Sequence, residues 1–423
     1  MGRTTALLLA CFILAQADKQ VMGLLGPQIQ GSFALSNTQL GFLQGGAFAI
    51  AFAIGGMPIA RLIDRGHRIR LAALCVAIWS VATILCGLAS SFALLLLFRA
   101  ATAVAEAALP PAAFSIFSQQ QDSRRVARQT GIFMLAPFIG GGLMLMLGGW
   151  LLQAVAGGPL PLLRGWEPWR IVMLSVGLPG LVLAPLLALL GREPKRAPPT
   201  ATAPAAAATR YRDVFAHIFV QRPFLRDYYL GMTAFYAATA SLLAWYPALL
   251  IRAMGMSVGS AGAYAGLTFL VGGVGGTALA TAFFASRPGL TSAAIIRVFL
   301  RVAMLLCPIL LALALAESVL LSITLYGLFA LLSAGVLAMM PVPIQLDLDD
   351  RLRGRGVAIM SLMMSALAGT IGPLFVGILM DVTGCGLGTA LAAILLLSSA
   401  ASIWLFARAD RARRLDDKSM AIC

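Results

Sequence analysis

The stretch ALLLACFILAQADKQVMGLLG (residues 6–26) decides the class of fold, because it is long enough to cross a membrane and yet contains an aspartate and a lysine. A helix of about 20 apolar residues spans the hydrocarbon core of a bilayer. A charged side chain inside such a span is costly, so it normally faces the interior of a helix bundle or a water-filled cavity. Asp18 and Lys19 therefore predict that this segment packs among several membrane helices.

A second apolar stretch, ALLLLFRAATAVAEAAL (residues 93–109), carries Arg99 and Glu106. Seven residues are about two helical turns, so these side chains share one helix face, roughly 10 Å apart. Four ionisable groups in two spans indicate a pathway for protons or substrate. The alternative interpretation is an ion-pair network that only holds the helices together.

The composition agrees with a polytopic helical membrane protein. Of the 423 residues, 60% are hydrophobic and only 11% are charged, and the mean hydropathy is +0.91. Soluble globular proteins do not reach such values. The apolar runs are also too continuous for the alternating strands of a β-barrel. Because the first run contains Asp18 and has no small-residue cleavage motif, we do not expect a cleavable signal peptide.

The pattern of apolar runs predicts an all-α protein with twelve membrane helices in two pseudo-symmetric six-helix bundles. The bundles comprise residues 1–191 and residues 227–423, the latter with a short cytoplasmic tail. A linker of residues 192–226 joins them, and its basic, aromatic part near Tyr211 to Phe219 predicts a helix on the membrane surface. The predicted spans are approximately 4–26, 37–61, 69–89, 91–118, 126–154, 169–191, 227–252, 258–286, 290–315, 318–345, 355–380 and 386–408.

The distribution of positive charge predicts the orientation. Arg3 and the segments that follow the even-numbered helices hold 26 of the 31 lysines and arginines, whereas the opposite loops hold three. Cytoplasmic loops of membrane proteins carry this excess. We therefore expect a multi-pass protein of the cell (inner) membrane with both termini in the cytoplasm. The net charge of +15 follows from this asymmetry and does not indicate a nucleic-acid partner.

The sequence does not indicate an enzyme or a metal site. It has six cysteines without a CxxC pair, and its two histidines lie in predicted loops. We recognise neither a nucleophile–base pair nor a phosphate-binding loop. We therefore expect no cofactor, and the ionisable groups inside the membrane spans indicate a proton gradient as the source of energy.

The loop between the second and third helices, PIARLIDRGHRIR (residues 58–70), resembles the signature loop of the major facilitator superfamily. Asp64, Arg65 and Arg68 match the pattern. The resemblance implies that these residues form a cytoplasmic latch between the bundles in the outward-facing state. The C-terminal half has no acid at the corresponding place. Four positions of the loop depart from the pattern: Ala60, Ile63, His67 and Ile69.

Further segments resemble the spinster-like branch of the superfamily, which includes lysosomal and sphingolipid transporters and bacterial homologues. In that branch, acids in helices 1 and 4 are responsible for proton coupling, which implies this role for Asp18 and Glu106, with Lys19 and Arg99 as charge partners. Lys19 stands where arginine is usual. The segments that carry the resemblance are Asp18–Lys19, SNTQLGFLQGGAFAI (36–50), FRAATAVAEAALPPA (98–112), GWEPWR (165–170), LLAWYPALLIRAMGMS (242–257) and RLRGRGVAI (351–359).

These features together predict a secondary transporter that moves a small amphipathic or lipid-like substrate by alternating access and acts as a monomer. LAPFIGGGLMLMLGGWL (residues 135–151) is similar to the motif of the superfamily's proton antiporters, so antiport or efflux is favoured. A proton-independent lipid flippase or facilitator and a non-transporting membrane sensor remain alternatives. We expect a cavity between helices 1, 4, 7 and 10. Candidate substrate-binding residues, each with an alternative role in an interhelical hydrogen bond, are Gln16, Gln20, Tyr229, Thr233 and Tyr236.

Overall fold

The computed structural model describes residues 2–119, 122–157, 165–193, 211–287 and 289–422. Within these ranges it does not describe the side chains at positions 57, 60, 64, 65, 123, 124, 127, 350, 351 and 415–422. The described residues form helices and connecting loops without any β-strand. The all-α prediction is therefore confirmed for this part of the chain.

The helices of the N-terminal half are α1 (Arg3–Phe33), α2 (Asn37–Gly41), the π-helical η1 (Phe42–Gly46), α3 (Ala47–Arg65), α4 (Arg68–Leu88), α5 (Phe92–Glu106), α6 (Leu109–Phe117), α7 (Ser123–Phe133), α8 (Ala136–Ala156) and α9 (Pro168–Leu190). Those of the C-terminal half are α10 (Tyr211–Ala216), the π-helical η3 (His217–Gln221), α11 (Pro223–Arg252), α12 (Val258–Ala285), α13 (Ser292–Ala314), α14 (Val319–Met339), α15 (Pro341–Asp347), α16 (Asp350–Leu362), the π-helical η4 (Met363–Ala368), α17 (Gly369–Thr383) and α18 (Leu387–Ile422).

Twelve helical segments of the described chain are long and apolar enough to cross a membrane, as the sequence predicts. The largest difference concerns the first span, which reaches Phe33 and not residue 26. Pro27 lies inside this helix, which continues until Ala34 adopts a left-handed backbone conformation with a φ of 50°. One proline removes a single backbone hydrogen bond, and packing against other membrane helices can outweigh that loss.

Prolines divide the fourth and the tenth spans at similar places. α5 ends at Glu106, and α6 begins at Leu109, directly before Pro110 and Pro111. Pro110 has no N–H to donate to the carbonyl oxygen of Glu106, so the regular hydrogen-bond ladder stops there. In the second half, α14 ends at Met339 and α15 starts at Pro341. The break in the fourth span therefore lies directly beside one of the two acids that the sequence singles out.

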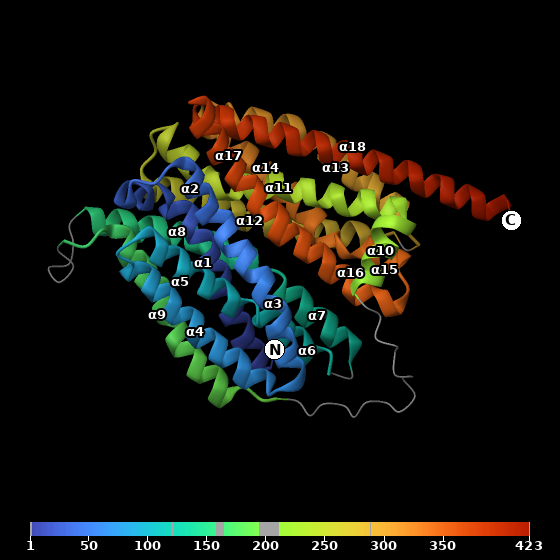
Figure 1. Ribbon diagram of the computed structural model, residues 1–423, viewed down its shortest axis with the longest axis horizontal. Coiled ribbons are helices and arrows are strands. Elements are labelled where there is room, and N and C mark those ends of the chain that lie inside the picture. Colours follow the sequence, from blue (N-terminus) through green and yellow to red (C-terminus); the bar gives the residue numbers. More distant parts are fainter. Residues whose placement is uncertain (1, 120–121, 158–164, 194–210, 288, 423) are drawn as a thin grey trace.

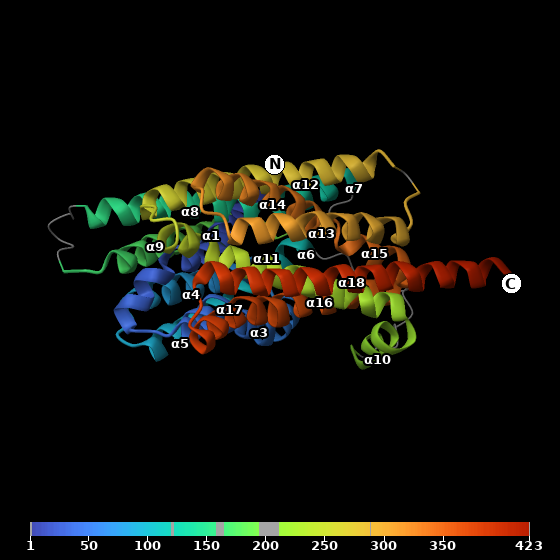
Figure 2. The same ribbon diagram turned by 90° about the horizontal axis from the view of Figure 1, so that it is seen from above.

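The two six-helix bundles lie side by side and diverge (Figure 1). They meet where α8 packs against α12, where α2 and η1 pack against α17, and where α1 packs against α11. The end at which α2 begins and α17 ends is called here the closed end. The bundles separate toward the other end, at which α1 begins and toward which α18 extends (Figures 1 and 2).

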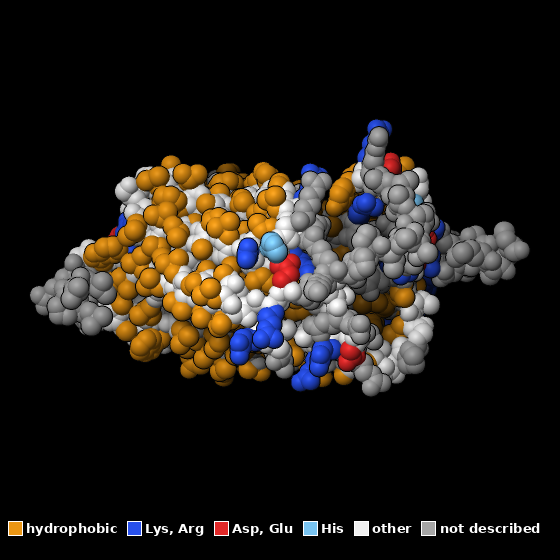
Figure 3. Space-filling model, turned by 90° about the horizontal axis from the view of Figure 1, so that it is seen from below, with side chains coloured by type: hydrophobic (Ala, Val, Ile, Leu, Met, Phe, Trp, Pro, Cys, Tyr) orange, Lys and Arg blue, Asp and Glu red, His pale blue; other side chains and the backbone are white. Residues whose placement is uncertain are grey.

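Hydrophobic side chains cover most of the half toward the closed end on the face shown in Figure 3. Lysine and arginine side chains on that face gather mainly toward the end that carries the termini (Figure 3). This arrangement suits a molecule whose middle lies in lipid and whose basic end lies in an aqueous compartment.

The N-terminal bundle contains two buried apolar clusters with a polar layer between them. α1 contributes residues up to Ala15 to one cluster and residues from Ala17 onward to the other, so Asp18 lies near their boundary. Thr83 of α4 and Arg99 of α5 occupy the same boundary, since neighbouring residues on their helices belong to different clusters. The fold therefore concentrates ionisable groups in one thin layer.

Candidate functional site

Asp18 and Arg99 form a buried ion pair between α1 and α5. The Asp18 residue is 0% exposed and the Arg99 residue is 1% exposed. One carboxylate oxygen accepts a hydrogen bond from the Arg99 guanidinium. The other accepts one from the Thr83 hydroxyl at 2.9 Å. Because both oxygens have donors, the charge on Asp18 is compensated despite its burial.

Glu106 lies behind this pair at the end of α5. The residue is only 3% exposed, and neither carboxylate oxygen has a hydrogen-bond partner among the described residues. Asp18, Lys19 and Arg99 are all close enough to interact with it electrostatically. The Nε of Arg99 is also buried without a hydrogen-bond partner in the described chain. The Glu106 carboxylate and the Arg99 Nε thus have unused hydrogen-bonding atoms, although buried polar atoms in proteins are normally hydrogen-bonded.

Lys19 leaves α1 in a different direction from its sequence neighbour Asp18, since successive residues are about 100° apart around a helix. Its Nζ lies 4.9 Å from the ring centroid of Phe48 and 4.7 Å from that of Phe52. The guanidinium carbon of Arg99 lies 4.6 Å from the Phe48 centroid. Among the described residues, Lys19 makes no ion pair or hydrogen bond. The faces of two aromatic rings and the nearby carboxylates of Glu106 and Asp18 therefore stabilise its charge.

Lys19 and Arg99 reach a cavity of about 140 Å³ between the two bundles. The cavity lies between membrane helices 1, 2, 4, 7 and 11. The sequence predicts that helix 10 lines the cavity as well. Helix 10 consists of α14 and α15, and none of their described residues lines the cavity, so this expectation is wrong. α14 instead packs against α12 and α13 of its own bundle. The residues that line the cavity are Lys19, Gln20, Gly23, Gln44, Gly45, Phe48, Ala49, Phe52, Arg99, Tyr236, Ala240, Leu243, Ala244, Ser365, Gly369 and Pro373.

Two of the five candidate substrate-binding residues, Gln20 and Tyr236, line this cavity, and three do not. The Gln16 side chain packs against Gly140 of α8. The Thr233 hydroxyl donates to the Tyr229 carbonyl oxygen of its own helix at 2.8 Å. The Tyr229 ring is buried within the C-terminal bundle.

Gln44 and Phe48 are cavity residues that sequence reasoning missed. The side-chain amide of Gln44 is buried, and neither its oxygen nor its nitrogen has a hydrogen-bond partner among the described residues. Both residues occur in SNTQLGFLQGGAFAI, where a glutamine inside an apolar helix is a recognisable polar signal. That pattern does not predict the π-helical conformation of η1, which contains Gln44.

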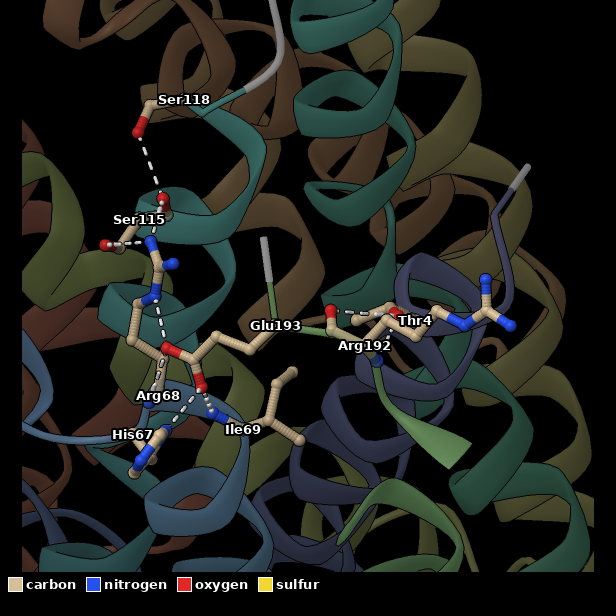
Figure 4. A network of polar contacts seen from close by, with 8 residues as sticks. All are labelled: Thr4, His67, Arg68, Ile69, Ser115, Ser118, Arg192 and Glu193. Atoms are coloured by element: carbon tan, nitrogen blue, oxygen red, sulfur yellow. Dashed lines mark hydrogen bonds and ion pairs between the residues drawn. The ribbon is translucent and has the colours of Figure 1, made fainter. Parts of the chain in front are cut away.

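Arg68, one of the predicted latch residues, lies in a network within the N-terminal bundle (Figure 4). It is 0% exposed, and its guanidinium donates to Glu193 at 2.9 Å and to the Ser115 carbonyl oxygen at 2.9 Å. The Glu193 carboxylate also accepts the backbone N–H groups of Arg68 and Ile69 at 3.1 and 3.2 Å, so it caps the start of α4. The side chains of Asp64 and Arg65 lie outside the described residues.

The pKa of Glu193 lies below its usual value. Partial burial acts to raise this pKa, but the hydrogen bonds from the Arg68 side chain and from the backbone of Ile69 and Arg68 outweigh it, and the charge of Arg68 adds to their effect. Glu193 is thus held as a carboxylate at the junction of α4, α6 and the segment after α9.

Comparison with known proteins agrees with this architecture. The family model described as "Major Facilitator Superfamily" matches residues 7–373. An MFS-type efflux pump of Mycolicibacterium smegmatis is 27% identical over 254 residues, which are 60% of this chain and 55% of the relative. A probable galactarate/D-glucarate transporter of Bacillus subtilis, GudP, is 25% identical over 283 residues, 62% of this chain and 59% of the relative. The chain thus spans little more than half of these relatives.

A solved structure resembles nearly the whole chain. It is a bacterial homologue of the human lysosomal transporter Spinster, in an inward-facing and unoccupied conformation. Its sequence is 26% identical, the TM-score is 0.77, and the alignment covers 97% of this chain and 96% of that one. The spinster-like resemblance of the sequence therefore extends to the fold. Because the family model covers most of the chain, the protein belongs to the Major Facilitator Superfamily, whose members are transporters and not enzymes.

Proposed function

We propose that this protein is a proton-coupled secondary transporter of the cell (inner) membrane that exports a small amphipathic or lipid-like substrate by alternating access, as a monomer. The similarity to an efflux pump and to a Spinster homologue supports this assignment. With both termini in the cytoplasm, the closed end faces outward and the structure is in an inward-facing state.

The observation that supports proton coupling is the buried Glu106 carboxylate, which accepts no hydrogen bond from the described residues, beside an Arg99 that is engaged by Asp18. A charged carboxylate in such a place is unfavourable, and binding a proton removes the charge. After Glu106 loses its proton, it competes with Asp18 for the single guanidinium. Rearrangement of Arg99 between two carboxylates, one on its own helix and one on α1, links the proton to the relative positions of helices.

The cavity wall favours a substrate with a negatively charged group. Lys19 offers a cation that makes no ion pair or hydrogen bond among the described residues, and Gln44 offers an amide with unused donors and acceptors. Phe48 and Phe52 supply apolar surface next to this charge. A carboxylate or phosphate on an apolar body would match both parts. The similarity to a galactarate/D-glucarate transporter is consistent with an anionic group.

In the outward-facing state the other end must close. We propose that Asp64 and Arg65 then form the latch that their sequence motif implies, with Arg68 kept in place by Glu193. This assignment rests on the resemblance of residues 58–70 to the superfamily's signature loop.

The test is transport by purified protein in liposomes with an imposed pH gradient. A fluorescent pH indicator inside the liposomes should report proton movement when an anionic amphiphile such as a lysophospholipid with a free phosphate is added. Proton movement should disappear in Glu106→Gln and persist in the matched control Glu317→Gln, whose carboxylate lies in an exposed loop. Substrate movement without proton movement would favour the flippase or facilitator, and binding without movement of either would favour the sensor.

A further inference from the structure

Asp381 belongs to α17 of the C-terminal bundle, near the end of that helix. Its side chain contacts the start of α2, where the second membrane helix of the N-terminal bundle begins. One carboxylate oxygen accepts hydrogen bonds from the backbone N–H and the side-chain amide of Asn37, at 3.2 and 2.8 Å. The other accepts hydrogen bonds from the backbone N–H and the hydroxyl of Thr38, at 2.7 and 2.6 Å. One carboxylate thus receives four hydrogen bonds across the boundary between the bundles.

These bonds complete a helix end that is otherwise only half satisfied. α2, η1 and α3 form one continuous span from Asn37 to Ile63. Ser36 caps this span by accepting the N–H of Gln39, and the Gln39 side chain accepts the N–H of Ser36. This capping box leaves the first two N–H groups of the helix free. Asp381 takes both, and its negative charge lies at the positive end of the helix dipole.

Glycines make this contact possible by letting the two backbones touch. A Cβ atom on Gly377, one turn before Asp381, would lie 2.2 Å from the carbonyl oxygen of Asn37. A Cβ atom on Gly41 would lie 2.5 Å from the carbonyl oxygen of Pro373. Atoms cannot approach so closely, so any larger residue at these positions would push α17 and α2 apart.

In the described part of the chain, two other hydrogen bonds join the bundles at the same end. Arg252 donates to Gln30, and the Ser257 hydroxyl donates to Gln153 at 3.1 Å. Each of these is one bond between side chains. Asp381 differs because two of its four donors are backbone groups, which cannot follow the carboxylate if the bundles separate.

We propose that Asp381 and the start of the second membrane helix form a charge-dependent latch that stabilises the state closed at this end. The proposal rests on the alternating access of the proposed function, since it needs a second state in which this end opens. Opening separates a carboxylate from four donors at once, and hydrogen bonds to charged groups are among the stronger ones in proteins. The latch therefore sets how readily the cavity becomes accessible from the closed side.

The test compares the distance between the bundles in variants of the full-length protein. Spin labels at Ser90 and Ser318, exposed residues at the closed end of the two bundles, are placed in a background whose native cysteines are replaced. Asp381→Asn keeps the size of the side chain but removes the charge and one acceptor. We expect a new population at longer distance, with the ratio of open to closed forms raised roughly ten-fold or more. Gly377→Ala should shift the ratio in the same direction without a change of charge.

Three controls make the result decisive. Gly386→Ala adds a methyl group where nothing lies within 4 Å and should leave the distances unchanged. Glu317→Gln removes an exposed charge at the same end and should also have no effect. Asp381→Glu keeps the charge and should shift the ratio less than Asp381→Asn.

A folded Asp381→Asn protein with the distance distribution of the wild type would overturn the latch. The proposed function fails separately: wild-type protein that moves neither substrate nor protons would contradict transport, while the distances would still report the latch. Conversely, intact proton-coupled transport with unchanged distances would leave the function standing and remove the latch.

Discussion

Arg99 pairs with Asp18 on the neighbouring helix and not with Glu106, seven residues away on its own helix. The sequence places Arg99 and Glu106 on one face of a helix, but about two turns separate them along its axis. Asp18 approaches from α1 at the level of Arg99 and also receives a hydrogen bond from Thr83. Of the two buried acids, only Asp18 is therefore paired with the Arg99 guanidinium in this structure.

Glu106→Gln should abolish transport driven by a pH gradient while leaving the protein folded. Glutamine keeps the shape of the side chain and cannot carry the charge, so the exchange of Arg99 that we propose between two carboxylates would be lost. Transport measured in liposomes as a function of the pH gradient checks this expectation. A variant that keeps the pH dependence of the wild type would exclude Glu106 as the coupling group.

Arg99→Ala should destabilise the protein strongly, because it leaves the Asp18 charge buried without compensation. Removing one partner of a buried ion pair typically costs about 3–5 kcal/mol. The double variant Arg99→Ala with Asp18→Asn should recover much of this loss, since no uncompensated charge remains. Thermal unfolding of the purified variants in detergent measures both effects. Equal destabilisation in the single and double variants would show that lost packing and not charge is the cause.

Lys19→Gln should weaken binding of anionic amphiphiles by roughly ten-fold or more, the loss expected for a hydrogen bond to a charged group. Binding of a neutral amphiphile with the same tail should change little, because the apolar walls formed by Phe48 and Phe52 remain. Lys19→Arg keeps the charge and should retain most of the affinity. Titration with a lysophospholipid and with a monoacylglycerol provides the comparison. Unchanged selectivity between them in Lys19→Gln would contradict this role.

Glu193→Gln should lower stability at neutral pH, with a difference from the wild type that shrinks in acid. The pKa of Glu193 is lowered in the folded protein, so its contribution is present above the unfolded pKa of about 4.3 and is lost as the pH falls through the folded value. Since the Glu193 side chain is still 23% exposed, solvent screens part of this contribution, and we expect an effect of about 1 kcal/mol. Melting temperatures of both proteins between neutral pH and about pH 3 test this. A difference that stays constant over this range would indicate that the carboxylate charge does not contribute.

The residues that line the cavity could be predicted from the sequence only in part. A polar residue in an apolar span identifies Gln20 and Tyr236 correctly as cavity residues, but the same criterion includes Thr233, whose hydroxyl is used within its own helix. Gln44 was missed because no ionisable residue lies near it in its span. Which polar side chain faces a cavity depends on the rotation of each helix against its neighbours, and helix periodicity alone does not give that rotation.

The number and approximate ends of the membrane helices, and the positions of the acids and bases within them, were determined by the sequence alone. Apolar length and charge are local properties that set the free energy of each segment in a bilayer, so they can be read without knowledge of neighbouring helices. The partners were decided by the tertiary structure: Arg99 for Asp18, aromatic rings for Lys19, and the start of α2 for Asp381. Each of these contacts joins residues of two different membrane helices, and only the packing of the helices brings them within reach.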